Sequence, residues 1–221
     1  NPKLEFSSQI PFHIGYFHES KFLYKTASFL NRTLPEHRIH LFFTLAKYAF
    51  CTGHPYWGYR FLGWGAHYIQ DLTQPYHSTA MPGASIIKLL WINFLDKIGR
   101  HGPKLNLIQL ISDQHLALEN YSYKLLKEIE QTNNPDHPLI KALSRIENDK
   151  SLPDYTDFYP RNIVSLESNK MADRTNSQLE LYLKDTSEAN RKIMADLNQK
   201  LLTNFALHTR KFFQAGLSNK K

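Results

Sequence analysis

The chain has 221 residues and a mass of 25.8 kDa, the size of one domain. Hydrophobic residues make up 42% of it, against nine Gly and eleven Pro, which excludes a disordered or fibrous protein. The longest apolar stretch, residues 86–95, is interrupted by Lys88 and Asn93 and is too short to span a bilayer. The formal charge of +7 favours anionic partners such as nucleic acid, acidic lipid or phosphate esters, without selecting among them.

Helical periodicity dominates the chain, and no run of alternating polar and apolar residues predicts a strand. We expect helices over residues 20–31, 37–51, 55–72, 84–99, 107–131, 138–147, 161–183 and 185–215, with a loop at 149–160. Gly53 should close the second helix in a left-handed conformation, and Pro55 should begin the third. Asp185 and Glu188 indicate a capping box at the start of the last helix, which Gly216 should end.

The third predicted helix ends in a cluster of potential metal ligands. His67 and Asp71 are four residues apart, so both project from one face of the helix. Pro75 then breaks the helix, and the turn can bring His77 to the same side. The rest of this helix is apolar and aromatic, and a buried carboxylate with neither a cation nor hydrogen-bond donors is unfavourable by several kcal/mol. We therefore predict a metal site at the end of this helix.

A second pair, His115 and Glu119, repeats the four-residue spacing on another helix. Helical bundles assemble multi-metal sites from helices that each present such ligands to a common interior. The same spacing also occurs in solvated surface pairs, so this pair alone does not decide between the two roles. His13 and His18 precede the first helix, and either could supply a further ligand. The prediction is one all-α, multi-helix domain over residues 1–221, with a clustered metal site in its helical core.

The order of these ligands resembles that of the zinc-dependent phospholipase C family, whose superfamily includes the fungal single-strand-specific nucleases. The pattern is His67-x3-Asp71-x2-Gln74-Pro75-x-His77, followed by His115-x3-Glu119-Asn120-Tyr121. The best-matched part covers residues 11–125, and the C-terminal helices are similar only in being helical. The resemblance implies a hydrolase that uses a zinc-activated water to cleave a phospholipid into diacylglycerol and a phosphorylated headgroup.

The resemblance also implies a role for each ligand. His67 would bind one zinc ion, and Asp71 would bridge that ion to a third. His77, His115 and Glu119 would hold the second zinc. Asp71 and Glu119 are thus the residues expected to serve catalysis, and two or three Zn²⁺ ions are expected per chain.

The first zinc site needs an earlier histidine, and His13 resembles it because it lies 54 residues before His67. His18, at 49 residues, is the rival candidate. The family also has a tryptophan, a histidine and an aspartate upstream, whereas this chain has no Asp before Asp71, and Glu5 is the only carboxylate before His13. We expect either a missing N-terminal segment, which we favour, or a degenerate third site in which Glu5 is a weaker candidate ligand.

The segment between His77 and His115 is longer than the family requires and contains the apolar run Ser85–Leu95. Two interpretations of this run are open: an interfacial helix that contacts a membrane surface presenting the phospholipid substrate, or a cap helix packed on the bundle, which a helix apolar on most faces favours. The aromatic residues 155–159 would line a headgroup pocket or cover the core. Cys51 is expected in the core, and the resemblance implies a secreted or periplasmic protein.

Two other functions stay open from the sequence. A single-strand-specific nuclease would use the same metals, and the positive charge suits a nucleic acid partner. Glu119, where Asp would be expected in a nuclease, resembles the phospholipase branch more closely. The third hypothesis is a non-catalytic module with a degenerate metal site.

Overall fold

The computed structural model describes residues 10–218, which form ten α-helices and no strand. The helices are α1 (Ile10–His13), α2 (Lys21–Thr26), α3 (Pro35–Cys51), α4 (Pro55–Leu72), α5 (Pro75–Ser78), α6 (Ile86–Lys97), α7 (Gly102–Thr132), α8 (Pro138–Ser144), α9 (Leu166–Lys184) and α10 (Glu188–Leu217). Shorter helical turns of other types cover Ser28–Asn31, Glu147–Ser151 and Pro160–Ser165. The all-α prediction is confirmed. Within the described residues, no helix combines the length and the hydropathy that crossing a membrane requires.

Several helix ends differ from the prediction. The first predicted helix is interrupted at Ala27, whose backbone leaves the helical region (φ −136°, ψ 68°). No capping box forms at α10, because the Asp185 carboxylate accepts a hydrogen bond from the Ser187 amide instead (3.0 Å). The last helix also continues through Gly216, where an added Cβ would lie 2.4 Å from Leu62 Cδ1. This glycine therefore permits close helix packing rather than ending the helix.

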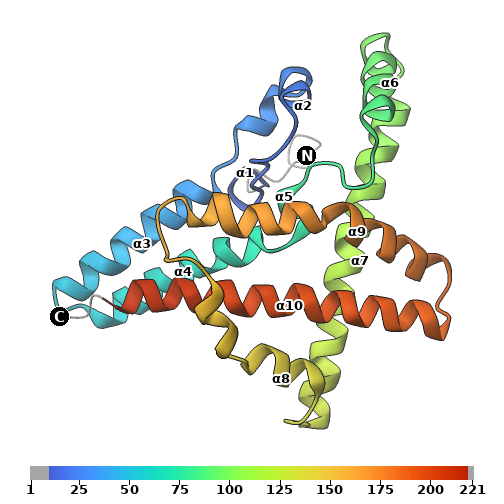
Figure 1. Ribbon diagram of the computed structural model, residues 1–221. Coiled ribbons are helices and arrows are strands. Elements are labelled where there is room, and N and C mark those ends of the chain that lie inside the picture. Colours follow the sequence, from blue (N-terminus) through green and yellow to red (C-terminus); the bar gives the residue numbers. More distant parts are fainter. Residues whose placement is uncertain (1–9, 219–221) are drawn as a thin grey trace, which may run out of the picture.

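The turn between α3 and α4 follows the prediction. Gly53 has φ 77°, and Pro55 is the first residue of α4. The expectation for Cys51 was wrong, because this residue is exposed at the end of α3. Figure 1 shows α3 and α4 lying side by side as a hairpin at one end of the molecule.

Two hydrophobic clusters hold the helices together. In the first, Ile39 of α3, Leu62 and Ile69 of α4, and Phe212 of α10 are fully buried. In the second, α5, α7, α9 and α10 contribute side chains that include Tyr76, Leu118, Leu179, Met194 and Leu197. The second cluster fixes the middle of α7 beside α5, immediately after the end of α4. This is where the predicted metal ligands lie.

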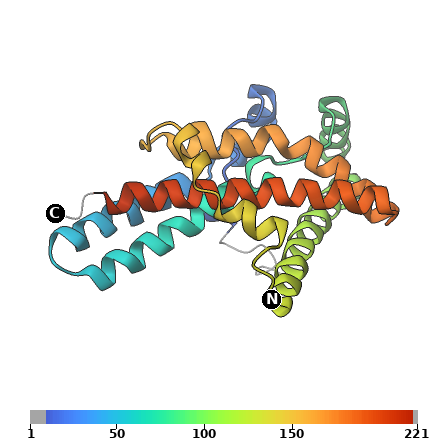
Figure 2. The same cartoon turned by 60° about the horizontal axis from the view of Figure 1, so that its bottom comes forward.

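The long helices cross rather than run in parallel. Figures 1 and 2 show α10 along the length of the molecule and α7 crossing it at a steep angle. Ser122 of α7 donates a hydrogen bond to Asn198 Oδ1 of α10 (2.6 Å) near this crossing. The first turns of α7 and the adjacent α6 extend away from the crossing.

Candidate metal centre

Six side chains from four helices converge in two groups of three. The first group is His13 of α1 with His67 and Asp71 of α4; the second is His77 of α5 with His115 and Glu119 of α7. Within each group, one ligand atom from each residue lies within 4.8 Å of the others. These are the two such groups among residues 10–218, and each could hold a metal ion.

Local structure explains why these residues meet. The continuous helix α4 places His67 and Asp71 one turn apart on one face. The Gln74 side chain then caps α5 by accepting a hydrogen bond from the Tyr76 amide (3.0 Å), which turns the chain back. The amide of Gly15 donates to the His77 carbonyl (2.7 Å). This contact holds the segment after α1, and hence His13, beside α5.

In the first group, two imidazole nitrogens and one carboxylate oxygen face a common point. His13 Nδ1 lies 2.7 Å from Asp71 Oδ2, and His67 Nε2 lies 3.5 Å from the same oxygen. His67 Nε2 and His13 Nδ1 are 3.2 Å apart. When these two imidazole nitrogens carry no proton, their lone pairs and that of Asp71 Oδ2 lie close enough together to bind one metal ion.

The second group repeats this arrangement. His77 Nε2 lies 3.1 Å from His115 Nε2, which lies 2.9 Å from Glu119 Oε1. On the other side of the ring, His77 Nδ1 lies 3.5 Å from Asp71 Oδ1. Asp71 therefore faces the first group with one oxygen and His77 of the second group with the other.

The histidines keep both carboxylates anionic. Burial raises the pKa of Asp71, but the hydrogen bond and positive charge of His77, helped by His67 and His13, outweigh it and lower the pKa overall. The hydrogen bond from His115 is the main cause of the lowered pKa of Glu119, against a smaller opposing effect of burial. When the imidazoles are neutral, the two carboxylates give the centre a net negative charge that attracts a cation.

Four of the six candidate ligands border a cavity of about 410 Å³ between α4, α7 and α10, called the metal cavity below. One wall carries the polar side chains of His67, Asp71, His77 and Glu119. An apolar part of the lining, called the apolar wall below, consists mainly of Leu118, Leu126, Leu201, Leu202 and Phe205. His67 and Glu119 are exposed, so the centre lies at an accessible margin of the helical core rather than deep inside it.

A layer of neighbouring side chains holds the second group in place. The Tyr76 ring stacks on His115 with centroids 5.7 Å apart and planes at 13°. The Tyr76 hydroxyl donates to Asn176 Oδ1 (3.0 Å), and the Asn176 amide donates to Glu180 Oε1 (3.1 Å). The position of the His115 ring thus depends on α9, far along the chain.

The structure separates the two candidates for the early histidine. His13 joins the first group, whereas His18 Nε2 contacts the backbone carbonyl of Arg161 (2.9 Å) and belongs to neither group. Glu5 lies outside the described residues. Sequence reasoning missed the apolar wall from α10, because Leu201, Leu202 and Phe205 follow the same helical periodicity as core residues.

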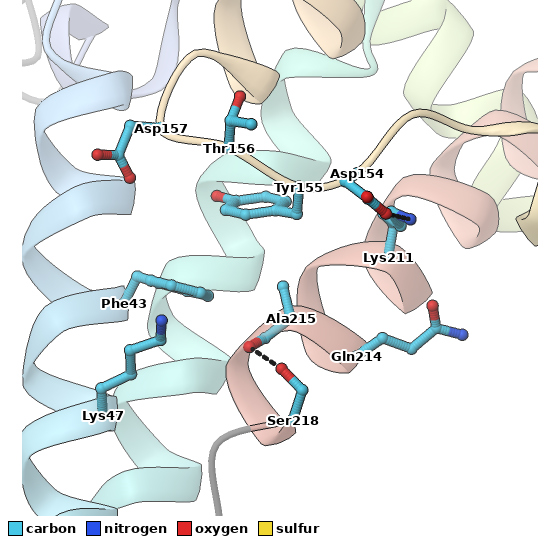
Figure 3. Close-up of a pocket in the computed structure, with 10 residues that line it drawn as sticks. All are labelled: Phe43, Lys47, Asp154, Tyr155, Thr156, Asp157, Lys211, Gln214, Ala215 and Ser218. Carbon is cyan, nitrogen blue, oxygen red and sulfur yellow. Dashed lines mark hydrogen bonds and ion pairs between the residues drawn. The ribbon is translucent and has the colours of Figure 1, made fainter.

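The aromatic loop borders a different cavity, of about 380 Å³, between α3 and α10 (Figure 3). Tyr155 lies over this cavity and Tyr159 is buried in the first hydrophobic cluster. The cavity shares no lining residue with the metal cavity. The structure therefore gives this loop no place beside the metal ligands, and its packing agrees with the alternative that it covers the core.

Fold and side chains together define an all-α protein with two groups of residues suited to metal binding. The chain matches no protein-family model, no curated protein and no solved structure.

Proposed function

We propose that this protein is a zinc-dependent phosphodiester hydrolase of the phospholipase C type. The observation that carries the proposal is the convergence of His13, His67 and Asp71 beside a second group that shares their cavity. These residues are spread over more than a hundred positions of the chain, yet they meet in space in two groups. The family resemblance likewise assigns His13 and His67 to one zinc and His77, His115 and Glu119 to another. A chance set of surface pairs would not be expected to assemble in this way.

The donor set suits zinc. All six ligands offer imidazole nitrogen or carboxylate oxygen, which zinc binds readily. Two ligand atoms on one tetrahedral zinc, each about 2.05 Å from it, lie about 3.3 Å apart. Five of the six contacts within the two groups range from 2.7 to 3.5 Å, and all the ligand atoms of a group lie within 4.8 Å of one another, so small adjustments would allow each group to hold one ion.

The catalytic contribution of zinc in such a site is to lower the pKa of a bound water and to neutralise charge on phosphoryl oxygens. The chain's own residues supply the geometry. Asp71 faces both groups and would hold the ions close together, while Glu119 completes the second group. Tyr76 restrains His115 by stacking, as neighbours of metal ligands often do.

The cavity supports a phospholipid as the substrate. Its polar wall would receive the phosphodiester, and its apolar wall, with Leu201, Leu202 and Phe205, would contact the glycerol and the first acyl carbons. The same wall would exclude water from that side of the scissile bond. Single-stranded nucleic acid offers less apolar surface to match this wall, so we favour the lipid.

Two measurements test the proposal. Plasma mass spectrometry on protein never exposed to chelator should find two or three zinc ions per chain. Phosphatidylcholine should be hydrolysed to diacylglycerol, and single-stranded DNA should not be cut. Cleavage of DNA alone would establish the nuclease alternative. A protein that binds no zinc, even after incubation with it, would overturn the catalytic proposal.

A further inference from the structure

Helix α6 and the first turns of α7 form a hairpin, residues 85–110, that projects from the helical body (Figure 1). α6 packs mainly on α7, and Ile92 of α6 is buried. Ser85 caps α6 by accepting a hydrogen bond from the Lys88 amide. The hairpin is thus an ordered element with one face turned away from the rest of the protein.

That outer face carries a row of large apolar side chains. Ile87, Trp91, Phe94 and Ile98 follow one another at helical spacing and are 79%, 60%, 52% and 55% exposed. The rings of Trp91 and Phe94 are stacked, with centroids 5.6 Å apart. Ile86 and Leu90 widen the row on one side. A continuous exposed apolar surface of this kind marks a binding face.

Positive charges border this row. Lys88, Lys97 and Arg100 are exposed and form no ion pair within the described part of the chain. The one acidic residue of the hairpin, Asp96, is already engaged by His101 (2.6 Å) and Lys104 (2.8 Å). On the helix, Lys88 and Lys97 lie on opposite sides of the apolar row. An apolar stripe flanked by free cations is the pattern of helices that lie in the interface of an anionic membrane.

We propose that this hairpin docks the protein on an anionic phospholipid surface. Trp91 and Phe94 would enter the boundary between headgroups and acyl chains, and the three free cations would contact lipid phosphates. A symmetric contact with a second copy would bring two sets of unpaired cations together, which is unfavourable. The role of this docking rests on the proposed function, because docking would bring a lipid-cleaving centre to its substrate.

The hairpin and the metal centre share one rigid helix. His115 lies 13 residues after the first residue of α7, which corresponds to about 20 Å along the helix axis. Docking through the first turns of α7 would therefore hold the centre at a fixed, short distance from the membrane.

Co-sedimentation with vesicles tests the proposal directly. The protein should bind vesicles of phosphatidylcholine with phosphatidylglycerol, and bind vesicles of phosphatidylcholine alone more weakly. Trp91→Ser/Phe94→Ser should lower partitioning at least about tenfold. Lys88→Gln/Arg100→Gln should lower it by about fivefold for each charge removed, on anionic vesicles only.

Matched controls exist elsewhere on the surface. Leu181→Ser/Leu183→Ser removes two similarly exposed apolar side chains from α9. Lys192→Gln/Lys200→Gln removes two exposed cations from α10. Both controls should partition like the wild type. If the controls lost as much vesicle binding as the hairpin variants, the binding would depend on general hydrophobicity or charge rather than on the hairpin, and the proposal would be overturned.

Tryptophan fluorescence locates the contact. The chain has three Trp residues, so Trp57→Phe/Trp64→Phe leaves Trp91 as the only reporter. Its emission should shift to the blue on anionic vesicles and be quenched by brominated lipids. Unchanged emission from vesicle-bound protein would place the contact elsewhere. A dimer in sedimentation velocity that Trp91→Ser/Phe94→Ser dissociates, without any binding to vesicles, would assign the hairpin to self-association instead.

A water-soluble, short-chain phosphatidylcholine below its micelle concentration separates this proposal from the proposed function. The hairpin variants should hydrolyse it like the wild type while losing hydrolysis of vesicles. Vesicle binding by a wild type that hydrolyses neither substrate would leave the docking intact and overturn the proposed function. Hydrolysis of both substrates without vesicle binding would support the proposed function and overturn the docking proposal.

Discussion

The two cavities of similar volume differ in how their charges are arranged. In the cavity of Figure 3, Lys211 lies 3.6 Å from Asp154, and Lys47 lies 4.7 Å from the centre of the Phe43 ring, so each cation already has a favourable neighbour. In the metal cavity, imidazole nitrogens and carboxylate oxygens converge, and no Lys or Arg lines the wall. The two cavities are similar in volume, and the cavity of Figure 3 has the more polar lining. What marks the other as a candidate metal site is the convergence of imidazole nitrogens and carboxylate oxygens with no Lys or Arg among its lining residues.

The largest expected effect comes from removing ligands of the second group. His77→Ala and Glu119→Ala should each lose about one zinc per chain and lower hydrolysis of phosphatidylcholine by at least about a thousandfold, because the metals supply most of the catalytic effect. Steady-state hydrolysis and plasma mass spectrometry measure the two quantities. Lys211→Ala, in the other cavity, is the control and should stay within about twofold of wild type. Unchanged activity of the ligand variants would support a module without catalysis at this centre.

Removing the metals should produce the next largest effect, on stability. Zinc present at about a thousand times its Kd stabilises a folded protein by about 4 kcal/mol, which for a domain of this size corresponds to roughly 8–16 °C in Tm. Differential scanning fluorimetry with and without chelator measures this shift, and added zinc should restore it. His77→Ala should show a smaller shift, and Lys47→Ala the full shift. An equal shift in His77→Ala would mean that the metal binds elsewhere.

The sequence predicted the meeting of the candidate ligands better than it predicted their surroundings. Each half of the centre has a local origin, since His67 and Asp71, or His115 and Glu119, lie one helical turn apart and so share a face in any α-helix. Choosing between His13 and His18 needed the tertiary contact between Gly15 and His77, which no local pattern contains. The fold class followed in the same way from periodicity, whereas the crossing of α7 and α10 did not.

The errors at helix ends share a physical reason. Glycine often ends a helix, but Gly216 lies within α10, where the absence of a side chain allows Leu62 to pack closely against the helix. Asp185 and Glu188 have the spacing of a capping box, but the Asp185 carboxylate bonds locally to Ser187. Tertiary packing and competing short-range hydrogen bonds decide such positions, and neither is visible in residue spacing alone.

Substitutions of Tyr76 should have smaller effects, and two variants separate the contribution of its ring from that of its hydroxyl. Tyr76→Phe keeps the stacking on His115 but leaves Asn176 Oδ1 without its donor, so it should lower the free energy of unfolding by about 1–2 kcal/mol and leave activity within a few-fold. Tyr76→Leu also removes the stacked ring and should weaken zinc binding in the second group by about 10- to 100-fold. Urea denaturation and zinc titration with a competing chelator measure the two effects. Equal zinc affinity in both variants would mean that the ring does not position His115.

The smallest expected effect is the pH dependence of the metal-free protein. The histidines lower the pKa of Asp71 in the folded protein, and a carboxyl with a lowered pKa stabilises the fold at pH values above its unfolded pKa, near 3.9. That contribution is lost as the pH falls through the lower, folded pKa. In chelator-treated protein, the free energy of unfolding of the wild type should therefore decrease relative to that of Asp71→Asn as the pH falls below about 4. Urea denaturation between pH 3 and 6 compares the two proteins, and parallel curves for wild type and Asp71→Asn would mean that the histidines do not favour the charged carboxylate.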